Sequence, residues 1–547
     1  MSIEEEKNTV PAQEDSKVAV TTKVVIGDEA FQQALIKEPP RMLQHPILIL
    51  ASFVAFCCST SNGYDTSLFG TLLANEHFKD FFSVSNAGIE AGIVTAIYQI
   101  GGVSAIPFIG PAIDTWGRRV GMFIGSLTIV VGTIIQACCV TNASVPQFMA
   151  GRYFTGFGVA IVAAAGPVYV VELSHPAYRG VVTGLYNVMW PVGALVAAGA
   201  ARGGLNYGGT TSWMIPIGLQ MMFPCIILFA ALFLPESPRW HFTRGQRERA
   251  RNTLTRLHGG GNPESEWVKL QLTEYEEFLK MDGSDKRWWD YRSLFKTRAS
   301  FYRLMCNCLV STFGQWAGNG IVSYFLSAFL DIAGIHGSIR QTDVQLGVTA
   351  TQIVFASLGA TFVDRLGRRP MLITVNLVCT LCWIGMIVPC SIANVSSPDA
   401  ADVENVSTSV SSAVVAFVFI FQACYSFGWT PMQALYPVEV LSFEIRAKGM
   451  AFSSLFTNAA LLSNQLGVPV ALERIAWRTY IIFCCWCTVQ AIIIYFMMPE
   501  TKNRTLEELD EIFAARNPVK KSLEKKKLDI DANKNILHVE DAGAARV

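Results

Sequence analysis

Charged residues are scarce in this chain of 547 amino acids: they make up 16% of it, against about 25% in an ordinary soluble protein. Neither sign is in excess, because Lys plus Arg and Asp plus Glu both number 43. The low charge argues against a string of soluble domains. The even balance argues against the basic surface by which proteins bind nucleic acid, so no nucleic-acid partner is expected.

The sequence also lacks the patterns of several other protein classes. Its 14 cysteines include adjacent pairs within apolar runs, and no spacing among them resembles a metal site. No nucleophile–base pair is recognisable, and the glycines of "GRYFTGFG" follow no strand, so they do not form a phosphate loop. We therefore expect no metal, no cofactor and no enzymatic activity. The polar N-terminal stretch is not a signal peptide and is expected to be disordered.

Apolar runs of about 20 residues recur along most of the chain, and each is long enough to cross a bilayer core of about 30 Å. The sequence therefore predicts an all-α membrane protein with twelve transmembrane helices, arranged as two six-helix bundles. The expected spans are 46–70, 87–111, 119–140, 146–171, 181–202, 213–234, 302–330, 344–363, 371–391, 411–435, 447–470 and 478–498.

Lys and Arg are unevenly distributed among the short loops, and this asymmetry predicts the orientation. "DTWGRRVG", "YRG", "DRLGRRP" and "EIRAKG" fall on one side, whereas "VTNASVPQ" on the other side has no Lys or Arg. Both termini are therefore expected in the cytosol, and the outer sequons at Asn142, Asn394 and Asn405 are candidate glycosylation sites. The predicted organisation is a cytosolic tail, a first bundle, a cytosolic linker with short helices, a second bundle and a cytosolic tail: 1–45, 46–234, 235–301, 302–498 and 499–547.

Three charged motifs occur once in each half of the chain, in the same order. "DTWGRR" recurs 250 residues later as "DRLGRR", "PESPR" recurs as "PETKNR", and both halves contain a Glu and an Arg seven residues apart. A duplicated six-helix unit is the natural cause. Parallel repeats of this kind build transporters whose site lies between the halves at the membrane midplane.

Acidic residues are interleaved with the basic ones in these motifs, which orientation alone does not require. We expect Arg118, Arg119 and Arg179 to pair with Glu172 and Glu236, and their counterparts to do the same, holding the cytosolic side closed. The alternative is that the motifs serve only as orientation signals and tight turns. The gating candidates are Asp114, Arg118, Arg119, Glu172, Arg179, Glu236, Arg239, Asp364, Arg368, Arg369, Glu439, Arg446 and Glu500.

Together these motifs resemble those of the sugar porters of the major facilitator superfamily. The matching segments are "GYD" at 63–65, the two "D-x-x-G-R-R" motifs, "GRYFTGFG", "PVYVVE", "PESPRW" and "PETKNRTLEELDEIF". The resemblance covers about residues 45–515. "ELSHPAYRG", "TGLYN", "FGQWAGNG" and "YPVEVL" are most similar to the fungal lactose-permease-like group, which includes disaccharide transporters.

One carboxylate, Asp65, falls within the first apolar span, where an ionisable group is costly and usually functional. The resemblance implies that this aspartate carries a proton and pairs with Arg152 in the fourth span. Helix geometry places the two at compatible depths. A carboxyl group whose contact with an arginine changes between states can take up and release a proton. The alternative is a static ion pair that fixes helix packing.

The resemblance also implies a sugar site on the fifth, seventh and tenth spans, and here the match is incomplete. Two amide positions fall on Gly314 and Gly320, and a tryptophan position falls on Ala434. These smaller residues are expected to widen the cavity, as a disaccharide or another bulky cargo would require. Helix packing is the alternative explanation for each expected contact. The expected cargo contacts are Asn187, Gln315, Asn319, Tyr324, Gln433, Tyr436, Asn458, Trp190 and Trp316.

The expected function is proton-coupled sugar symport by alternating access, with lactose, another galactoside or another disaccharide taken up across a plasma membrane by a monomer. The partners are thus a sugar, a proton and the lipid bilayer. The alternatives are a hexose or polyol transporter, a sugar porter adapted to a non-sugar metabolite, and a non-transporting sugar receptor. The short tail after Glu500 argues against a receptor, which usually carries a long cytosolic tail.

Overall fold

The computed structural model of the chain describes most of it, from residue 37 to residue 542. The described residues are 37–38, 46–84, 88–282, 292–396, 408–442, 446–502, 504, 506–530 and 536–542.

The first half of the chain forms a bundle of long helices with one short helix outside it. α3 (Glu76–Phe82) is the short helix and follows directly on α2. The α4 helix continues into a π-helical turn at Pro111–Thr115 and contains Pro107. The bundle helices are α2 (Pro46–Leu73), α4 (Ile89–Gly110), α5 (Arg118–Ala137), α6 (Val145–Leu173), α7 (Arg179–Gly204), α8 (Thr211–Leu219) and α9 (Met222–Ala230).

The second half repeats this arrangement, except that its first span is divided into three helices. α14, α15 and α16 follow one another with breaks at Gly318 and Phe325. The helices of this bundle are α14 (Arg298–Trp316), α15 (Asn319–Tyr324), α16 (Leu326–Ile332), α17 (Ser338–Leu366), α18 (Arg368–Ser396), α19 (Thr408–Val440), α20 (Arg446–Ile475) and α21 (Thr479–Met497).

Short helices occupy the linker and the C-terminal tail, as the amphipathic sequence of the linker predicts. A two-stranded antiparallel hairpin closes the tail, and Lys525 pairs with Ala542 in it. These elements are α10 (Pro238–Thr243), α11 (Arg247–Leu257), α12 (Glu266–Asp282), α13 (Ser293–Lys296), α22 (Leu506–Ala514), α23 (Pro518–Ser522), β1 (Lys525–Ile530) and β2 (Ile536–Ala542).

Ten helical stretches within the described residues are long and apolar enough to span a membrane. The last of them, Lys448–Met497, contains both α20 and α21 and so holds two spans. The divided helix α14–α16 is not among the ten and supplies the remaining crossing. The expectation of an all-α membrane protein with twelve spans in two bundles is therefore confirmed.

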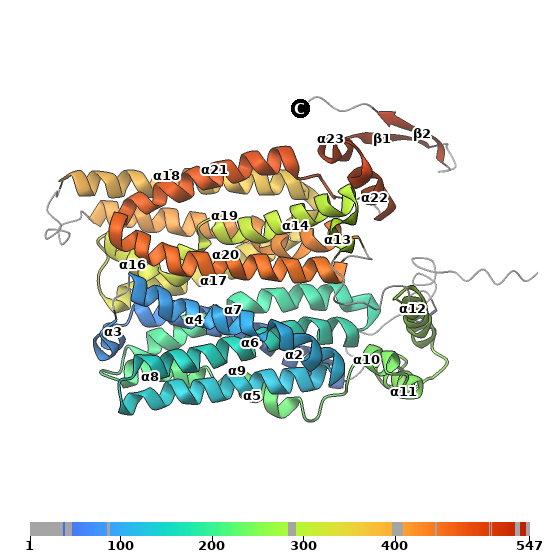
Figure 1. Ribbon diagram of the computed structural model, residues 1–547, viewed down its shortest axis with the longest axis horizontal. Coiled ribbons are helices and arrows are strands. Elements are labelled where there is room, and N and C mark those ends of the chain that lie inside the picture. The colour runs from blue at the N-terminus through green and yellow to red at the C-terminus, as the bar shows by residue number, and fades with distance from the viewer. Residues whose placement is uncertain are drawn as a thin grey trace, which may run out of the picture.

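Figure 1 shows the two bundles side by side, with α10–α12 and α22–α23 at one end and α3 and α16 at the other. We call these the inner end and the outer end; the positive-inside rule assigns the inner end to the cytosol. Near the outer end the bundles touch: Glu76 N–H donates to Ser338 Oγ at 3.2 Å, Gly88 N–H donates to Pro469 O at 3.1 Å, and Arg202 pairs with Asp343.

Candidate functional site

A cavity of about 550 Å³ lies between the bundles. Tyr324, at the end of α15, lines its outer part. Ile109, one residue before the end of α4, and Ser454, about 12 Å along α20 from its inner start, line its inner part. The cavity therefore extends from the middle of the molecule towards the inner end, while the bundles meet at the outer end.

Asp65 lies on α2 beside this cavity and is completely buried. Ser61 Oγ donates a hydrogen bond to its Oδ2 at 3.2 Å, and Oδ1 has no hydrogen-bond partner. The amide of Gln220, between α8 and α9, lies near the carboxyl group without reaching hydrogen-bond geometry. Asn62 and Thr66, on adjacent turns of α2, line the cavity, so Asp65 is one layer behind its wall.

Arg152 on α6 is brought to Asp65 as expected, but the two side chains do not form the expected ion pair. No guanidinium nitrogen lies within 4.0 Å of a carboxylate oxygen, and Nη1 instead donates to the main-chain oxygen of Asp65 at 3.3 Å. The guanidinium lies between the rings of Phe69 and Tyr98, 5.3 and 4.8 Å from their centroids. Cation–π contacts thus stabilise a buried arginine whose Nε also lacks a partner.

The seventh span is broken at Gly318, between α14 and α15. Gly318 has a φ of 101°, a left-handed conformation that glycine adopts without a steric penalty. A Cβ at this position would lie 2.3 Å from the Trp383 ring. Both the backbone conformation and the lack of space for a side chain therefore require glycine. The break places Gln315 on α14 and Asn319 on α15, rather than on one continuous helical face. Asn319 Oδ1 is buried and has no hydrogen-bond partner.

The amide groups of the cavity form a closed hydrogen-bonded chain across α14 and α19. Gln315 Nε2 donates to Gln433 Oε1 at 2.8 Å, and Gln433 Nε2 donates to the Tyr425 hydroxyl at 2.9 Å. That hydroxyl in turn donates to Gly314 O at 2.7 Å. The chain holds both amides at the cavity wall, where a hydroxylated cargo could exchange hydrogen bonds with them.

The two glycines expected to widen the cavity do not leave open space. A Cβ on Gly314 would lie 2.6 Å from Gln433 Nε2, and a Cβ on Gly320 would lie 3.3 Å from Asn464 Nδ2. Amide side chains from α19 and α20 therefore lie close to these two glycines. The expectation of a wider cavity is wrong at Gly314, where Gln433 fills the space. Gly320 itself lines the cavity with Asn464 close beside it, and the side chain of Ala434 is outside the described residues.

Six of the nine expected cargo contacts line the cavity: Trp190, Gln315, Asn319, Tyr324, Gln433 and Asn458.

The other three do not, and each has a physical reason. Asn187 is exposed on α7 and is not part of the cavity wall. The Trp316 indole donates to Ala460 O at 3.2 Å and packs edge-on against Trp486, between helices of its own bundle. Tyr436 is fully buried at the inner end, where its hydroxyl donates to Pro499 O at 3.1 Å.

Several polar residues of the cavity were not anticipated, although helical spacing contains the signal. Tyr425 lies eight residues, or about two turns, before Gln433 and therefore on the same face of α19. Asn62 precedes Asp65 by three residues on α2. Gln99 on α4 and Gln352 on α17 are amides inside apolar runs and also line the cavity. An amide within a membrane span is uncommon enough to mark a cavity or a helix contact.

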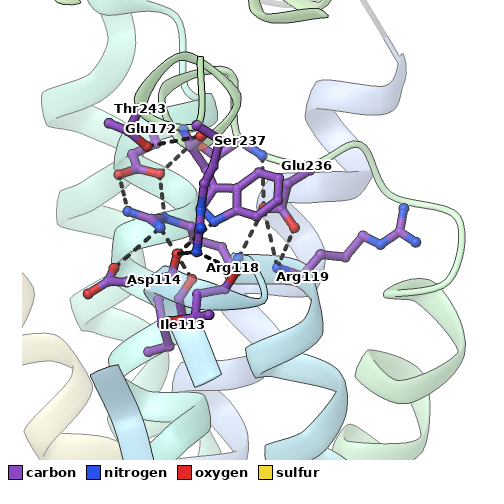
Figure 2. A network of polar contacts seen from close by, with 11 residues as sticks. Ile113, Asp114, Arg118, Arg119, Glu172, Glu236, Ser237 and Thr243 are labelled. Atoms are coloured by element: carbon purple, nitrogen blue, oxygen red, sulfur yellow. Dashed lines mark hydrogen bonds and ion pairs between the residues drawn. The ribbon is translucent and has the colours of Figure 1, made fainter. Parts of the chain in front are cut away.

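The inner end of the first bundle holds the first set of charged motifs in one network (Figure 2). Arg118 Nε and Nη2 donate to the two carboxylate oxygens of Glu172 at 2.8 and 3.1 Å, a bidentate geometry. Asp114 lies 3.3 Å from the same guanidinium, and Ser237 Oγ donates to Glu172 at 2.5 Å. The main-chain N–H groups of Arg118 and Arg119 donate to Glu236, which thereby caps the N-terminus of α5.

The second bundle repeats this geometry at its own inner end. Arg368 Nε and Nη2 contact the Glu439 carboxylate at 3.0 and 2.5 Å, and Thr501 Oγ1 donates to Glu439 at 2.5 Å. The N–H groups of Arg368 and Arg369 donate to Glu500, which caps α18. Tyr436, whose hydroxyl contacts Pro499, corresponds to Tyr169, whose hydroxyl donates to Pro235 O at 2.8 Å.

Some of the expected pairs differ in detail. The guanidinium groups of Arg119 and Arg369 donate to main-chain oxygens, of Leu234 and Tyr495, rather than to a glutamate. Arg179, at the start of α7, lies outside ion-pair distance of Glu172 and Glu236. Its Nε is buried without a hydrogen-bond partner.

The contacts described for these two networks lie within one bundle, so they stabilise each bundle while the cavity extends towards the inner end. Arg239 lies on α10, and the side chains of Asp364 and Arg446 are outside the described residues. Among the sequons, Asn142 is exposed at the outer end, whereas the Asn394 side chain and Asn405 are outside the described residues.

Two similar helical bundles around a polar cavity, with a buried carboxylate beside it, define a secondary transporter. The family model described as "Sugar (and other) transporter" matches residues 51–513. The chain therefore belongs to the sugar porter family of the major facilitator superfamily.

The relatives within this family are distant and their names differ. A high-affinity glucose transporter of Kluyveromyces lactis is 26% identical over 506 residues, which cover 90% of each chain. A probable quinate permease of Aspergillus flavus is 26% identical over 507 residues, covering 87% of this chain and 89% of the relative. The inward-open structure of the xylose transporter XylE from E. coli has a TM-score of 0.69 at 18% identity and covers 85% of this chain and 99% of its own. This structural likeness confirms the fold.

Proposed function

We propose that the protein is a proton-coupled sugar symporter in which Asp65 carries the proton. The observation that carries this proposal is a fully buried carboxylate one layer behind a polar cavity, with a nearby arginine that contacts its main-chain oxygen and not its carboxylate oxygens. Intramembrane ionisable groups with incomplete partners are typical of proton and substrate pathways. A static ion pair would instead show direct contact between the two side chains.

The route between the proton site and the cargo site runs through close helix contacts. A Cβ on Gly70 of α2 would lie 2.8 Å from Ser323 O on α15, so the helix that carries Asp65 packs directly on the broken seventh span. Tyr324, the next residue on α15, lines the cavity and lies near Arg152. A change in the charge of Asp65 would therefore act on the segment that contacts the cargo.

The cargo that fits the cavity best is a small polyhydroxylated molecule, such as a hexose or another polyol. Amide and hydroxyl groups of Gln315, Gln433, Tyr425 and Asn319 form its polar wall, and Trp190 supplies an aromatic surface. The relatives named for glucose and quinate, and a neighbour named as a proton:xylose symporter, support cargo of this size. Because Gln433 fills the space beside Gly314, this glycine gives no support for a disaccharide such as lactose.

The duplicated inner networks act, in this proposal, as struts that keep each bundle rigid while the bundles rock against each other. The protein would then alternate between the arrangement seen here and one that opens at the outer end. We place it in the plasma membrane as a monomer, with both termini in the cytosol and Asn142 available for glycosylation outside.

Uptake by a yeast strain that lacks its own hexose transporters tests this function. Labelled hexoses, pentoses, polyols, quinate and disaccharides are supplied at external pH 5 and 7.5, with and without a protonophore. We expect accumulation of at least one monosaccharide-sized polyol that is stronger at pH 5 and abolished by the protonophore. Accumulation that persists with the protonophore would contradict proton coupling, and accumulation confined to disaccharides would contradict the proposed cargo.

A further inference from the structure

A second cavity, of about 320 Å³, lies at the inner end where the linker helix α11 meets the first bundle. Ile47 at the start of α2 and Phe233 after α9 form its apolar wall. Asn252, Thr253 and Arg256 of α11 form its polar wall, and Pro235 and Leu257 complete the lining. One side is thus apolar and the other polar and cationic, which is the chemistry of the boundary between acyl chains and headgroups.

The apolar wall is continuous with surface that faces the bilayer. The Phe233 side chain is 83% exposed, and Phe229, four residues earlier, is 65% exposed. On the other helix, Leu50 lies one turn beyond Ile47 on the same face and is 47% exposed. Large apolar side chains exposed to this degree require lipid around them, so an acyl chain beside these residues would lead directly to the cavity.

One arginine of the polar wall has no hydrogen-bond or ion-pair partner among the described residues. Three of the four arginines on α11 have protein partners: Arg247 contacts Glu276, Arg249 contacts Gln246 and Arg251 contacts Glu264. Arg256 makes no hydrogen bond or ion pair within the part of the chain that the structure describes. It is exposed and lines the cavity together with Thr253 and Asn252. The Thr253 hydroxyl donates to Arg249 O at 2.9 Å, so the Arg256 guanidinium and the Asn252 amide are the donors that remain. These groups suit a phosphate diester.

We propose that this cavity, defined by Ile47, Phe233, Asn252, Thr253 and Arg256, binds an anionic phospholipid of the inner leaflet. The headgroup phosphate contacts Arg256 and the polar wall, while the acyl chains follow Phe233 and Phe229. Anionic lipids are concentrated in the cytosolic leaflet and are attracted by basic residues at its surface. The bound lipid would join α2, α9 and α11, and so fix the linker to the first bundle.

Native mass spectrometry of the purified full-length protein tests this site, with phosphatidylglycerol and phosphatidylcholine of identical acyl chains as probes. We expect phosphatidylglycerol to remain bound to the unmodified protein and phosphatidylcholine not to remain bound. Arg256→Gln is expected to lower the bound phosphatidylglycerol about fivefold, the effect of one basic residue near an anionic surface. Arg249→Gln removes the same charge from the same helix outside the cavity and is expected to have no effect.

A second variant tests the cavity without changing its charge. Thr253→Trp is expected to fill it and to lower phosphatidylglycerol binding as strongly as Arg256→Gln. Equal losses in Arg256→Gln and Arg249→Gln would overturn the proposal, because net charge alone would explain them. Full binding by both Arg256→Gln and Thr253→Trp would also overturn it. So would complete displacement of the lipid by millimolar inorganic phosphate, which would identify a phosphate site with no role for the acyl chains.

Discussion

At the scale of single residues, some of the buried polar atoms that lack partners lie beside the central cavity, whereas others, such as Ser126 Oγ, are buried elsewhere in the bundles. Asp65 Oδ1, Arg152 Nε and Asn319 Oδ1 are buried without hydrogen bonds, and all three lie beside the central cavity. A buried polar atom without a partner costs about 1–3 kcal/mol. Such a cost is tolerated where a proton or a cargo hydroxyl will satisfy the atom in another step of the cycle.

Asp65→Asn should abolish accumulation against a gradient while exchange down a gradient persists. The amide has nearly the same shape as the carboxyl group but cannot bind and release a proton. Accumulation of the identified cargo should fall to equal concentrations inside and outside, and uptake should lose its dependence on external pH. Ser61→Ala, which removes only the donor to Oδ2, serves as the control and should remain concentrative. Concentrative, pH-dependent uptake by Asp65→Asn would exclude this residue from coupling.

Gln315→Ala should raise the apparent Km about ten- to hundredfold with unchanged surface expression. The variant removes the proposed hydrogen bond to the cargo and leaves Gln433 without its partner, each worth about 1–3 kcal/mol when buried. Trp316→Phe is the matched control, because Trp316 follows directly in sequence but points away from the cavity towards Ser463. Uptake kinetics over a range of cargo concentrations measure both. Equal Km values for Gln315→Ala and Trp316→Phe would show that the α14 wall does not contact the cargo.

At the scale of elements, the duplicated motifs explain how helix ends are held at the inner end. Gly117 and Gly367 have φ values of 109° and 91°, and each lies directly before the first residue of a helix. A Cβ on Gly117 would lie 2.3 Å from Glu236 Oε2, so glycine allows the capping carboxylate to approach. The negative charge also lies favourably against the positive end of the helix dipole.

The two arginines of the first motif should differ in their effect on stability. Arg118→Ala removes a bidentate partner from the largely buried Glu172 and should lower the free energy of unfolding by about 3 kcal/mol. Arg119→Ala removes one hydrogen bond to the main-chain oxygen of Leu234 and should lower the free energy of unfolding by about 1 kcal/mol. Thermal unfolding in detergent measures both, and Arg368→Ala and Arg369→Ala provide the same comparison in the second bundle. Equal losses within each pair would contradict the roles assigned by these contacts.

The linker helix α12 meets the first bundle through a buried histidine, which predicts a pH dependence. His258 Nε2 donates to Leu173 O at 3.0 Å, and its Nδ1 accepts from Gln271 Nε2 at 2.9 Å. Burial lowers the pKa of His258 to about 4, from an ordinary 6.5. The folded state therefore binds fewer protons than the unfolded state between these values, so stability is complete above pH 6.5 and falls as the pH approaches 4.

This loss should reach about 2 kcal/mol at pH 5, since each pKa unit corresponds to about 1.4 kcal/mol. Thermal unfolding recorded at pH values between 7.5 and 4.5 measures it. His175, whose ring lies 5.2 Å from that of His258 and whose pKa burial also lowers to about 4, adds to the same loss. His258→Asn should therefore reduce the pH dependence without abolishing it, at the cost of lower stability at pH 7.5. His77→Asn, on the exposed surface of α3, is the control and should leave the profile unchanged. An identical pH profile in both variants would show that His258 does not account for the dependence.

At the scale of the whole molecule, the two bundles are joined near the outer end while the cavity extends towards the inner end. The interbundle ion pair joins Arg202 Nε on α7 to Asp343 Oδ1 on α17 at 2.7 Å. Both side chains are partly exposed, at 31% and 54%, so the pair contributes only about 0.2–1 kcal/mol. A contribution of this size can bias the balance between two conformations without locking one of them.

Asp343→Ala should therefore shift the population towards the outward-open state by no more than about fivefold. Cysteine-accessibility labelling from each side measures the shift, with reporter cysteines in the outer and inner halves of the cavity. The charge swap Arg202→Asp with Asp343→Arg should restore the original labelling, whereas either change alone should not. If the single variants leave the labelling unaltered, this ion pair does not contribute to the balance between the two conformations.

The spans, their grouping into two halves and the positions of the charged motifs could all be predicted from the amino-acid sequence. The reason is that these features depend on local composition and on spacing along one helix. Apolar length defines a span, and the repeat at an interval of 250 residues defines the halves. The break at Gly318 was also foreseeable, because glycine lowers the cost of leaving a regular helix. Asp65 was singled out as an ionisable group in apolar surroundings and Arg152 through the family resemblance, and the structure brings them together.

Only the tertiary structure decided which side chains face the cavity and which face another helix. Trp316 and Tyr436 have the polar and aromatic character of cargo contacts, yet neighbouring helices bind their polar groups. Gly314 indicates open space in the sequence, but Gln433 enters that space from a helix more than 100 residues away. The volume beside a residue depends on what packs against it from other helices, and spacing along its own helix does not contain that information.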